Sequence, residues 1–261
     1  MSSACRKVVA ACFSLLPVFA QTATLRVCAD PNNLPFSNRQ QQGLENKLAD
    51  LVAASMNTKV EYRWWVERKS FAKKSLNAGA CDAVMGIPRG MDDVLTTDPY
   101  YRSSYVFVSR QDRNLQIESL SDPRLAELRI GVHVVGDDYA PPAFALAHRG
   151  IVKNVIGFSL YGAYGEADPP RKLIGAVENG DIDVAIAWGP LAGYFAQGAK
   201  LPLTIAPVEP PVFLGVPFAY DISIGVREGD ASLQQQLNRI LQQQSSAIQA
   251  LLASYGVPQV H

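Results

Sequence analysis

Histidine and cysteine, the side chains that most often bind metals or act as nucleophiles, are sparse in this chain. Its histidines are His133, His148 and His261, and none lies in a His-Glu-x-x-His motif. The chain also contains no Gly-x-Ser-x-Gly and no Cys-x-x-Cys sequence. The paired acids at 92–93 and 137–138 lack the alternating spacing of a calcium loop. We therefore expect a protein that is not an enzyme, with no catalytic residues, no metal site and no cofactor.

Polar and aromatic side chains that could bind a ligand or a partner stand at predicted strand ends and helix starts, which face the ligand edge of an α/β sheet. The candidates for a ligand- or partner-binding cleft are Asn33, Pro35, Phe36, Glu45, Asn46, Arg89, Tyr100, Asp137, Asp138, Trp188 and Tyr194. Arg89 also fits a solvated turn cation, whereas the large ring of Trp188 at a strand end favours a binding role. His133 stands inside an apolar strand and fits a core or edge residue better than a ligand contact.

Two copies of one local pattern position these candidates. Residues 79–88 are Gly-Ala-Cys-Asp-Ala-Val-Met-Gly-Ile-Pro, and residues 180–190 are Gly-Asp-Ile-Asp-Val-Ala-Ile-Ala-Trp-Gly-Pro. Each begins with a glycine suited to the end of a helix and continues through an Asp into an apolar run without alternation. Such a run predicts a parallel strand buried on both faces, with helices above and below it. The sequence therefore predicts two halves, each an open α/β sheet.

The remaining pattern predicts the elements around these two strands. Strands are expected at 25–29, 60–65, 104–108, 130–134 and 219–226. Helices are expected at 44–56 and 71–77, and a longer helical segment runs from an N-cap at Asp230 to Gly256. The prolines and asparagines of residues 30–36 predict a loop at the ligand edge.

The middle of the chain differs in composition from its flanks, because all three Pro-Pro pairs lie between residues 141 and 211. We expect residues 24–109 plus 213–261 to form one lobe and residues 110–212 to form the other. Two chain crossings would let these lobes hinge about a cleft.

Residues 1–20 have the pattern of a secretory signal peptide. Arg6 and Lys7 precede an apolar run, and small residues occupy the cleavage-defining positions before the expected cut after Ala20. The run is too short to span a bilayer, so we expect a periplasmic protein without membrane insertion. A lipoprotein cleavage box ending at Cys12 is the weaker alternative, because almost no hydrophobic segment precedes it.

Charge and cysteine content describe the expected mature chain further. The full chain has 24 Lys+Arg and 24 Asp+Glu, so loss of two cations leaves it near neutral, without a basic field for nucleic acid. Cys28 and Cys81 remain after removal of the signal. A pair of cysteines in an oxidising compartment, on strands expected to be neighbours, predicts a disulfide; two buried thiols are the alternative.

Several segments carry a family resemblance. Residues 79–86 (Gly-x-x-Asp-Ala-Val-Met-Gly) and 97–101 (Thr-Asp-Pro-Tyr-Tyr), with the doubled lobe, resemble type II periplasmic solute-binding proteins (solute-binding protein family 3) over about residues 24–256. Residues 27–38, 43–47 and 96–107 are similar to the quinoprotein dehydrogenase-associated (MoxJ/XoxJ-like) branch. The resemblance implies a periplasmic binding protein type II-like α/β fold: two lobes, each a mostly parallel sheet flanked by helices, and two hinge crossings.

The chain departs from the amino-acid-binding members of that family. They hold the ligand carboxylate with an Arg in a longer loop after the first repeated strand, whereas here the loop is short and Arg89 is the cation near it. They hold the amine with an Asp at the end of the second repeated strand, where this chain has Trp188. A ring can stack on an ammonium group but cannot neutralise it. These departures argue against an amino-acid ligand.

The resemblance implies a non-catalytic accessory of a periplasmic pyrroloquinoline-quinone-dependent methanol or alcohol dehydrogenase. The surface expected to contact this quinoprotein is the cleft and its rim, with Phe36, Trp188, Tyr194 and the Pro-Pro loops. The alternative is the substrate-binding component of an ABC importer, which would close on a small polar solute with charges of opposite sign on the two lobes.

Overall fold

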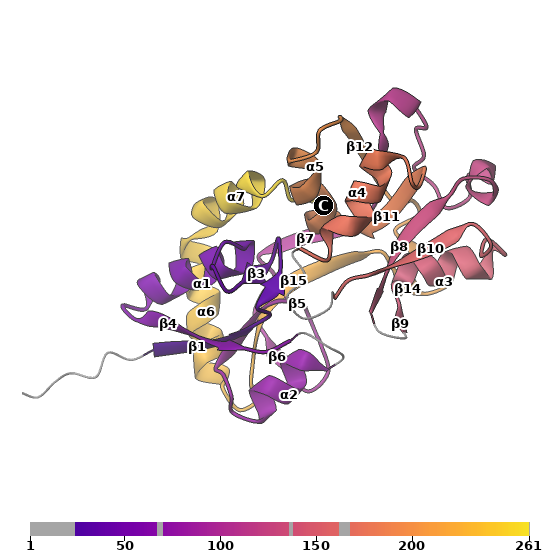
Figure 1. Ribbon diagram of the computed structural model, residues 1–261. Helices are drawn as coiled ribbons and strands as arrows, with labels where there is room; N and C mark the ends of the chain where they lie inside the picture. Colours follow the sequence, from indigo (N-terminus) through magenta and orange to yellow (C-terminus); the bar gives the residue numbers. More distant parts are fainter. Residues whose placement is uncertain (1–23, 67–69, 136–137, 162–167, 261) are drawn as a thin grey trace, which may run out of the picture.

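The structure is a computed structural model that describes residues 24–66, 70–135, 138–161 and 168–260. The expected signal peptide and Asp137 lie outside these residues. Figure 1 shows the described chain as two groups of strands and helices placed side by side. No helix in the described ranges is long and apolar enough to cross a membrane.

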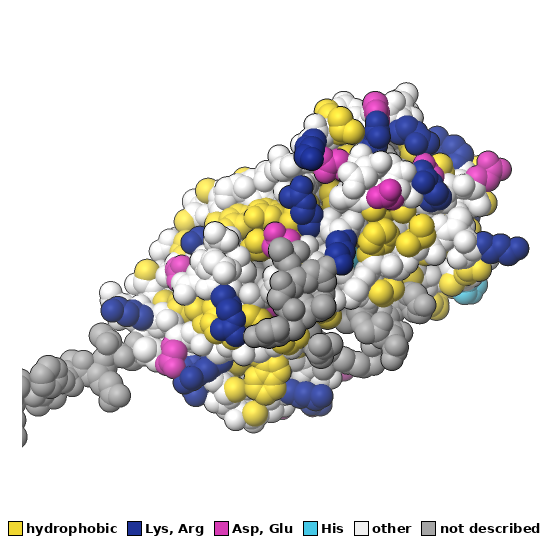
Figure 2. Space-filling view, in the orientation of Figure 1, with side chains coloured by type: hydrophobic (Ala, Val, Ile, Leu, Met, Phe, Trp, Pro, Cys, Tyr) yellow, Lys and Arg dark blue, Asp and Glu magenta, His cyan; other side chains and the backbone are white. Residues whose placement is uncertain are grey.

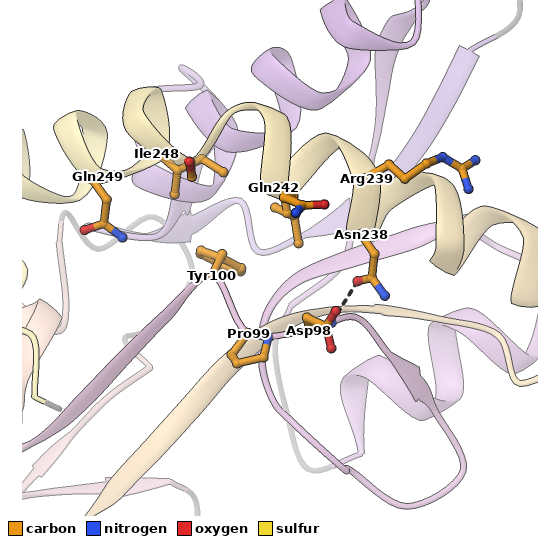
Figure 3. Close-up of a pocket in the computed structure, with 10 residues that line it drawn as sticks. Asp98, Pro99, Tyr100, Asn238, Arg239, Gln242, Ile248 and Gln249 are labelled. Atoms are coloured by element: carbon orange, nitrogen blue, oxygen red, sulfur yellow. Dashed lines mark hydrogen bonds between the residues drawn. The ribbon is translucent and has the colours of Figure 1, made fainter.

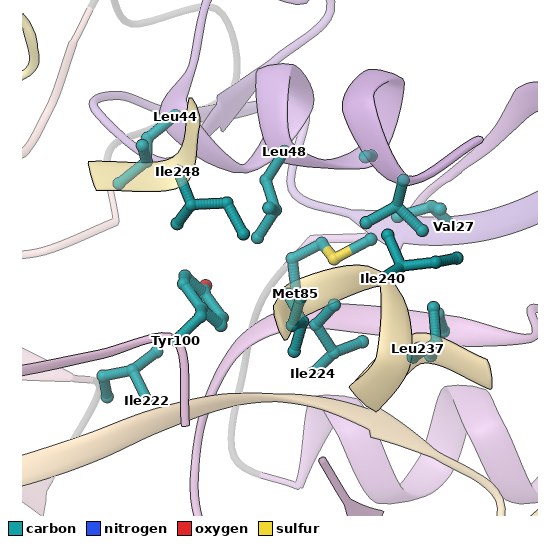
Figure 4. Packing of buried hydrophobic residues seen from close by; sticks show 14 of the residues in the cluster. Val27, Leu44, Leu48, Met85, Tyr100, Ile222, Ile224, Leu237, Ile240 and Ile248 are labelled. Atoms are coloured by element: carbon teal, nitrogen blue, oxygen red, sulfur yellow. The ribbon is translucent and has the colours of Figure 1, made fainter. Parts of the chain in front are cut away.

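The first half forms a sheet around β1 (Thr24–Ala29). This strand is parallel to β4 (Lys59–Trp64) on one side and to β5 (Ala83–Pro88) on the other, and β15 (Ala219–Val226) is antiparallel to β5. The helices α1 (Leu44–Ser55), α6 (Ala231–Gln243) and α7 (Ser245–Ser254) pack on one face. Figure 4 shows Met85 of β5 between Leu48 of α1 and Ile240 of α6. The helix α2 (Phe71–Asn77) contributes to a second core with Cys28 and Cys81.

The second half forms a sheet around β8 (Ile130–Val135). This strand is parallel to both β10 (Val155–Ser159) and β11 (Val184–Trp188). The strands β11 and β12 (Leu203–Pro207) are antiparallel to β7 (Tyr101–Arg110). Helices α4 (Arg171–Asn179) and α5 (Gly189–Gln197) belong to one core, and α3 (Pro141–His148) belongs to another.

The strands β7 and β15 join the two halves. Residues 101–104 of β7 pair with β15, whereas residues 105–110 pair with β11 and β12. Strand pairing is therefore continuous from β10 to β4. Along β7 and β15, the chain passes from the core of the first half to that of the second near residues 104–105 and 218–219. Phe218 already lies in a core of the second half. The expected lobe boundaries at 109–110 and 212–213 lie within this second packing unit, and the division into two lobes stays a prediction.

Short elements complete the described chain. Two-residue strands pair as β2 (Asn32–Asn33) with β3 (Ser37–Asn38), β6 (Leu95–Thr96) with β15, β9 (Asp138–Tyr139) with β8, and β13 (Val212–Phe213) with β14 (Val216–Pro217). Single 3₁₀ turns occur at Gln111–Arg113 and Pro123–Ala126.

Each repeated strand begins at the same Arg–Asp contact. Asp82 Oδ2 accepts hydrogen bonds from Arg26 N at 3.0 Å and Arg26 Nε at 3.1 Å. Asp183 Oδ2 accepts from Arg129 N at 2.9 Å and Arg129 Nε at 3.0 Å. Both aspartates thus fix the start of their strand against the strand beside it, which is a structural role.

The expected disulfide is present between Cys28 and Cys81, whose Cα atoms are 5.6 Å apart. The expected helices at 44–56 and 71–77 are α1 and α2. The C-terminal segment is two helices, because it breaks at Gln244. Asp230 stands at the N-cap of α6 but makes no side-chain capping bond; its carboxylate lies 2.7 Å from Arg227 Nη2 instead. The expected N-cap position of Asp230 is confirmed, although its side chain does not cap the helix.

Candidate binding cleft

A cavity of about 390 Å³ lies between the two halves, at the carboxyl ends of β5 and β11. This is the sheet edge at which open α/β folds bind ligands. The lining includes residues from the first half, from the second half and from the joining strands: Phe36, Gly86, Tyr105, His133, Trp188 and Tyr220. We call this cavity the cleft. The structure brings Phe36 and Trp188, from the sequence candidates, into its lining.

Trp188 holds a central place among the aromatic side chains of the cleft. It pairs with Tyr105 across β11 and β7, and the two ring centroids are 5.5 Å apart at an interplanar angle of 63°. Tyr220 on β15 meets Trp188 at 5.9 Å and 69°. These are edge-to-face contacts, which favour a fixed ring orientation. Side chains of β7 and β15 therefore fix the orientation of the Trp188 ring at the end of β11.

The loop after β1 is fastened to the start of α1. Leu44 N donates to Pro35 O at 2.7 Å, and Glu45 N donates to Phe36 O at 2.9 Å. Asn46 is fully buried, and its Oδ1 accepts from Asn38 N and Gly43 N, both at 3.1 Å. Asn33 is buried in β2, within the same loop. These contacts place Phe36 at the cleft and give Asn46 a capping role.

Glu45 lies directly behind the cleft wall at Gly86. Gly86 has a φ of +73°, and a Cβ on it would lie 1.8 Å from Glu45 Oε1. Only glycine therefore leaves room for this carboxylate. Glu45 also raises the pKa of Tyr100 and Tyr101, adding to the larger effect of burial on both hydroxyls. The candidate Glu45 stands next to the cleft rather than in its lining.

Tyr100 and Arg89 do not line the cleft. Tyr100 is buried between Ile222 and Ile248 in the core (Figure 4). It also borders a second cavity, of about 530 Å³, whose lining comes from residues 98–100 and from α6 and α7 (Figure 3). There Asp98 N donates to Asn238 Oδ1 at 2.8 Å. Arg89 is exposed, with Nη2 3.5 Å from Asp98 Oδ1.

Among the other second-half candidates, Tyr194 is absent from the described lining of the cleft. Tyr194 on α5 stacks on Tyr255, with ring centroids 5.6 Å apart and planes 17° apart. The backbone of Asp138 pairs with Val135 in the β8–β9 ladder. The candidate Asp137 lies outside the described residues.

Comparison with known proteins places the chain in a family. Residues 25–257 match the model of the bacterial extracellular solute-binding proteins, family 3. The chain belongs to this family. Protein MoxJ of Methylorubrum extorquens is 32% identical over 249 residues, which is 90% of this chain and 81% of that protein.

Two solved structures are similar over nearly the whole chain. MxaJ from Methlophaga aminisulfidivorans MPT has a TM-score of 0.80 and 30% identity, covering 90% of this chain and 100% of its own. The periplasmic binding protein XoxJ from Methylobacterium extorquens AM1 has a TM-score of 0.73 and 31% identity, covering 91% and 99%. The expected periplasmic binding protein type II fold and MoxJ/XoxJ-like resemblance are confirmed.

The cleft residues of this solute-binding protein that were missed as site candidates include Tyr105, His133 and Tyr220. Tyr105 and Tyr220 are distant in sequence, but the strands β7 and β15 that carry them are paired neighbours. His133 was expected in a core or at an edge, and it is indeed buried, yet it also lines the cleft. A signal was present for Tyr105, since it follows the Pro-Tyr-Tyr-Arg-Ser segment that carries the family resemblance.

The described lining of the cleft is uncharged at neutral pH. It contains no Asp, Glu, Lys or Arg. Burial lowers the pKa of His133 to about 4, against the opposing effect of the Pro170 carbonyl, so its imidazole is neutral. Figure 2 shows Lys and Arg on both halves with Asp and Glu between them. No group of three or more His, Cys, Asp or Glu in the described ranges is placed to hold a metal ion.

Proposed function

We propose that this chain is a non-catalytic periplasmic binding protein that acts as the partner of a pyrroloquinoline-quinone-dependent alcohol dehydrogenase. The observation that carries the proposal is the aromatic, uncharged lining of the cleft around Trp188. The similarity to MoxJ, MxaJ and XoxJ supports the same reading, because the dehydrogenase-associated branch includes these proteins. The dehydrogenase would insert an apolar side chain or loop between Phe36 and Trp188.

The charges near the cleft suit this partner better than an amino acid. A zwitterion needs a cation for its carboxylate and an anion for its amine, and the described lining supplies neither. Arg89, the candidate cation near the shortened loop after the first repeated strand, pairs with Asp98 and does not line the cleft. The rim of the cleft would therefore bury apolar partner surface with little cost of desolvating charge.

Import of a small solute is the second candidate function. It is favoured by membership in a solute-binding family and by a cleft between two halves whose sheets, in the described residues, are joined through the pairing of β7 with β15. In that case a free metabolite alone would stabilise the protein, without any dehydrogenase.

The deciding experiment combines two measurements. The dehydrogenase is immobilised, and retention of the mature protein is measured by a pull-down and by surface plasmon resonance. A thermal-shift panel of amino acids, alcohols, pyrroloquinoline quinone and metal ions is run in parallel. Retention without a metabolite-induced shift supports the partner function. A metabolite-induced shift with no retention contradicts it and favours import.

Trp188→Ala tests the cleft as the contact surface. Removing a buried aromatic anchor is expected to weaken retention by about 2 kcal/mol. Trp65→Ala is the matched control, because Trp65 is exposed at the end of β4 and does not line the cleft. Equal affinity of the two variants for the dehydrogenase would remove the cleft from the interface.

A further inference from the structure

The cleft is apolar in most of its lining, and two of the side chains there with hydrogen-bonding atoms have no hydrogen-bond partner for one of those atoms among the described residues. These are the imidazole of His133 on β8 and the hydroxyl of Tyr105 on β7. Around them lie Phe36, Leu160 and Trp188. A cavity of this size and kind suits a mostly apolar group oriented by a few polar contacts.

The contact between His133 and Pro170 defines which ring nitrogen can accept a hydrogen bond. His133 Nε2 lies 3.4 Å from Pro170 O. A carbonyl oxygen only accepts, so this contact assigns the proton of the neutral ring to Nε2. Nδ1 is then an acceptor, and no described residue donates to it. His133 is only 5% exposed, so an occupant of the cleft that lacks a donor leaves this nitrogen without a partner.

Tyr105 is the second polar contact. Its ring is fixed by edge contacts with Trp188 and with Phe218, at centroid distances of 5.5 and 6.5 Å. Burial raises the pKa of its hydroxyl, which is therefore uncharged over the whole neutral range. The structure gives this hydroxyl no hydrogen-bond partner among the described residues. A hydroxyl both donates and accepts, so it can complement a phenol or an indole N–H.

We propose that the cleft binds an uncharged planar aromatic ring that bears one hydroxyl or N–H group, as in a phenol or an indole. The ring lies beside Phe36 and Trp188, its polar hydrogen is donated to His133 Nδ1, and the Tyr105 hydroxyl borders the same cavity. This inference rests on the proposed function, because it names the occupant of the same cleft. The ring belongs either to a free small molecule or to a Tyr or Trp side chain of the dehydrogenase.

The same lining disfavours other classes of occupant. A zwitterion, a polycarboxylate or a metal ion would lose its hydration without gaining a charged partner in the described lining. A plain hydrocarbon ring would fit the apolar walls but would leave His133 Nδ1 unpaired. A ring with one neutral donor satisfies both requirements.

The test measures binding of four probes to the mature protein by calorimetry: indole, p-cresol, toluene and L-tryptophan. Indole and p-cresol are expected to bind about tenfold more tightly than toluene, the effect of one hydrogen bond. L-tryptophan, which adds a zwitterion to the same ring, is expected to bind more weakly than indole. Equal binding of indole and toluene, tighter binding of L-tryptophan, or no binding of either aromatic donor overturns the proposal.

Variants assign the effect to the two polar contacts. His133→Phe keeps a ring in place and is expected to lower the affinity for indole about tenfold without changing that for toluene. Tyr105→Phe is expected to lower the affinity for p-cresol, whose oxygen can accept a hydrogen bond from the Tyr105 hydroxyl, and to leave that for indole unchanged. Tyr255→Phe is the matched control, because Tyr255 donates to Gln42 O outside the cleft. Thermal unfolding at neutral pH confirms that each variant is folded. If His133→Phe binds indole as the wild type does, Nδ1 has no role in binding and the proposal fails.

Competition with the dehydrogenase separates the two sources of the ring. Displacement of the bound dehydrogenase by saturating indole assigns the ring to its Tyr or Trp side chain. Indole binding that leaves retention unchanged assigns the ring to a free small molecule. Retention of the dehydrogenase by a protein that binds neither indole nor p-cresol overturns this inference and leaves the proposed function standing.

Discussion

The two repeated strands begin alike and end differently. β5 and β11 both start at an Asp held by the backbone and guanidinium of an Arg, Arg26 in one half and Arg129 in the other. At its carboxyl end β5 has Gly86 backed by a carboxylate, whereas β11 has Trp188. The shared start is required to align the strands. The different ends give the two walls of the cleft different chemistry.

Equivalent core positions in the two halves are also joined by different means. The first position lies two residues after the Arg and is Cys28 in the first half and Gly131 in the second. The other position lies one residue before the Asp and is Cys81 in the first half and Ile182 in the second. The pair in the first half forms a disulfide. In the second pair a Cβ on residue 131 would lie 2.4 Å from Ile182 Cδ1, so the isoleucine fills the space that glycine leaves. The same strand contact is covalent in one half and made by packing in the other.

The largest expected effect comes from removing the covalent link. The two cysteines are 53 residues apart in sequence, and Cys28→Ala combined with Cys81→Ala is expected to lower the free energy of unfolding by about 4 kcal/mol. Denaturant unfolding measures the loss, and titration of the denatured, unreduced mature protein, from which the expected signal peptide has been removed, should find no free thiol. A double variant as stable as the oxidised wild type would contradict the estimate.

The second largest expected effect on stability comes from His133, which lies in the second half and makes the unfolding free energy depend on acid. Its pKa is lowered to about 4 in the folded protein from 6.5, so the unfolded chain takes up the proton first as the pH falls. Above pH 6.5 the imidazole is neutral in both states, and its burial does not reduce the free energy of unfolding. Between pH 6.5 and 4 the unfolded chain alone binds the proton, which lowers the free energy of unfolding by about 3 kcal/mol. His133→Phe should lack this loss. The measurement is the difference in unfolding free energy between variant and wild type across that pH range, and a constant difference would contradict it.

Asp183→Asn tests the Arg–Asp contact that begins β11, which is the copy with the larger shift in the pKa of its carboxylate. Hydrogen bonds from Arg129 hold the pKa of Asp183 at about 2, below its usual 3.8. The ionised carboxylate therefore stabilises the fold above pH 3.8, and this is lost as the pH falls toward 2. The variant is expected to cost about 2 kcal/mol at pH 7 and nothing near pH 2.

Asp82→Asn is the partner measurement, since the Arg26 contacts lower the pKa of Asp82 and outweigh its burial. Its loss at pH 7 should have the same sign. A stabilising effect of either change, measured by urea unfolding, would show that the common contact does not align the strands.

The smallest expected effect concerns the packed counterpart of the disulfide. Ile182→Val removes the Cδ1 methyl that covers Gly131 and is expected to cost about 1 kcal/mol in unfolding free energy. Ile156→Val is the control, because Ile156 is 42% exposed on β10 and should change stability little. A loss at residue 182 no larger than that at residue 156 would mean that this methyl does not tie the two strands together.

The sequence was sufficient for elements defined by local periodicity. The leucines of residues 44–56 predict α1, and the unbroken apolar runs predict β5 and β11, because burial on one stripe or on both faces leaves a direct pattern. The disulfide could be predicted because only two cysteines follow the expected signal peptide.

The site was predicted less completely, because its walls depend on contacts between distant segments. Tyr105 and Tyr220 enter the cleft through the antiparallel pairing of β7 and β15, which no local pattern encodes. Asn46 resembles a ligand contact in sequence, but its amide oxygen is used by the backbone of residues 38 and 43. Arg89 stands next to a strand end that lines the cleft, yet its guanidinium lies beside Asp98.

The place of β15 has a consequence for the order in which the protein is completed. This strand lies between β5 and β7, although it comes more than a hundred residues after either of them. As the chain grows from its N-terminus, β1, β4 and β5 can pair, and the disulfide can close, long before residue 226 has emerged. Until then one edge of β5 has unpaired backbone N–H and C=O groups, which could pair with a strand of another chain. An early bridge between Cys28 and Cys81 would keep β5 in register with β1 during that interval. The edge of β5 to which β15 later adds would then already be in place.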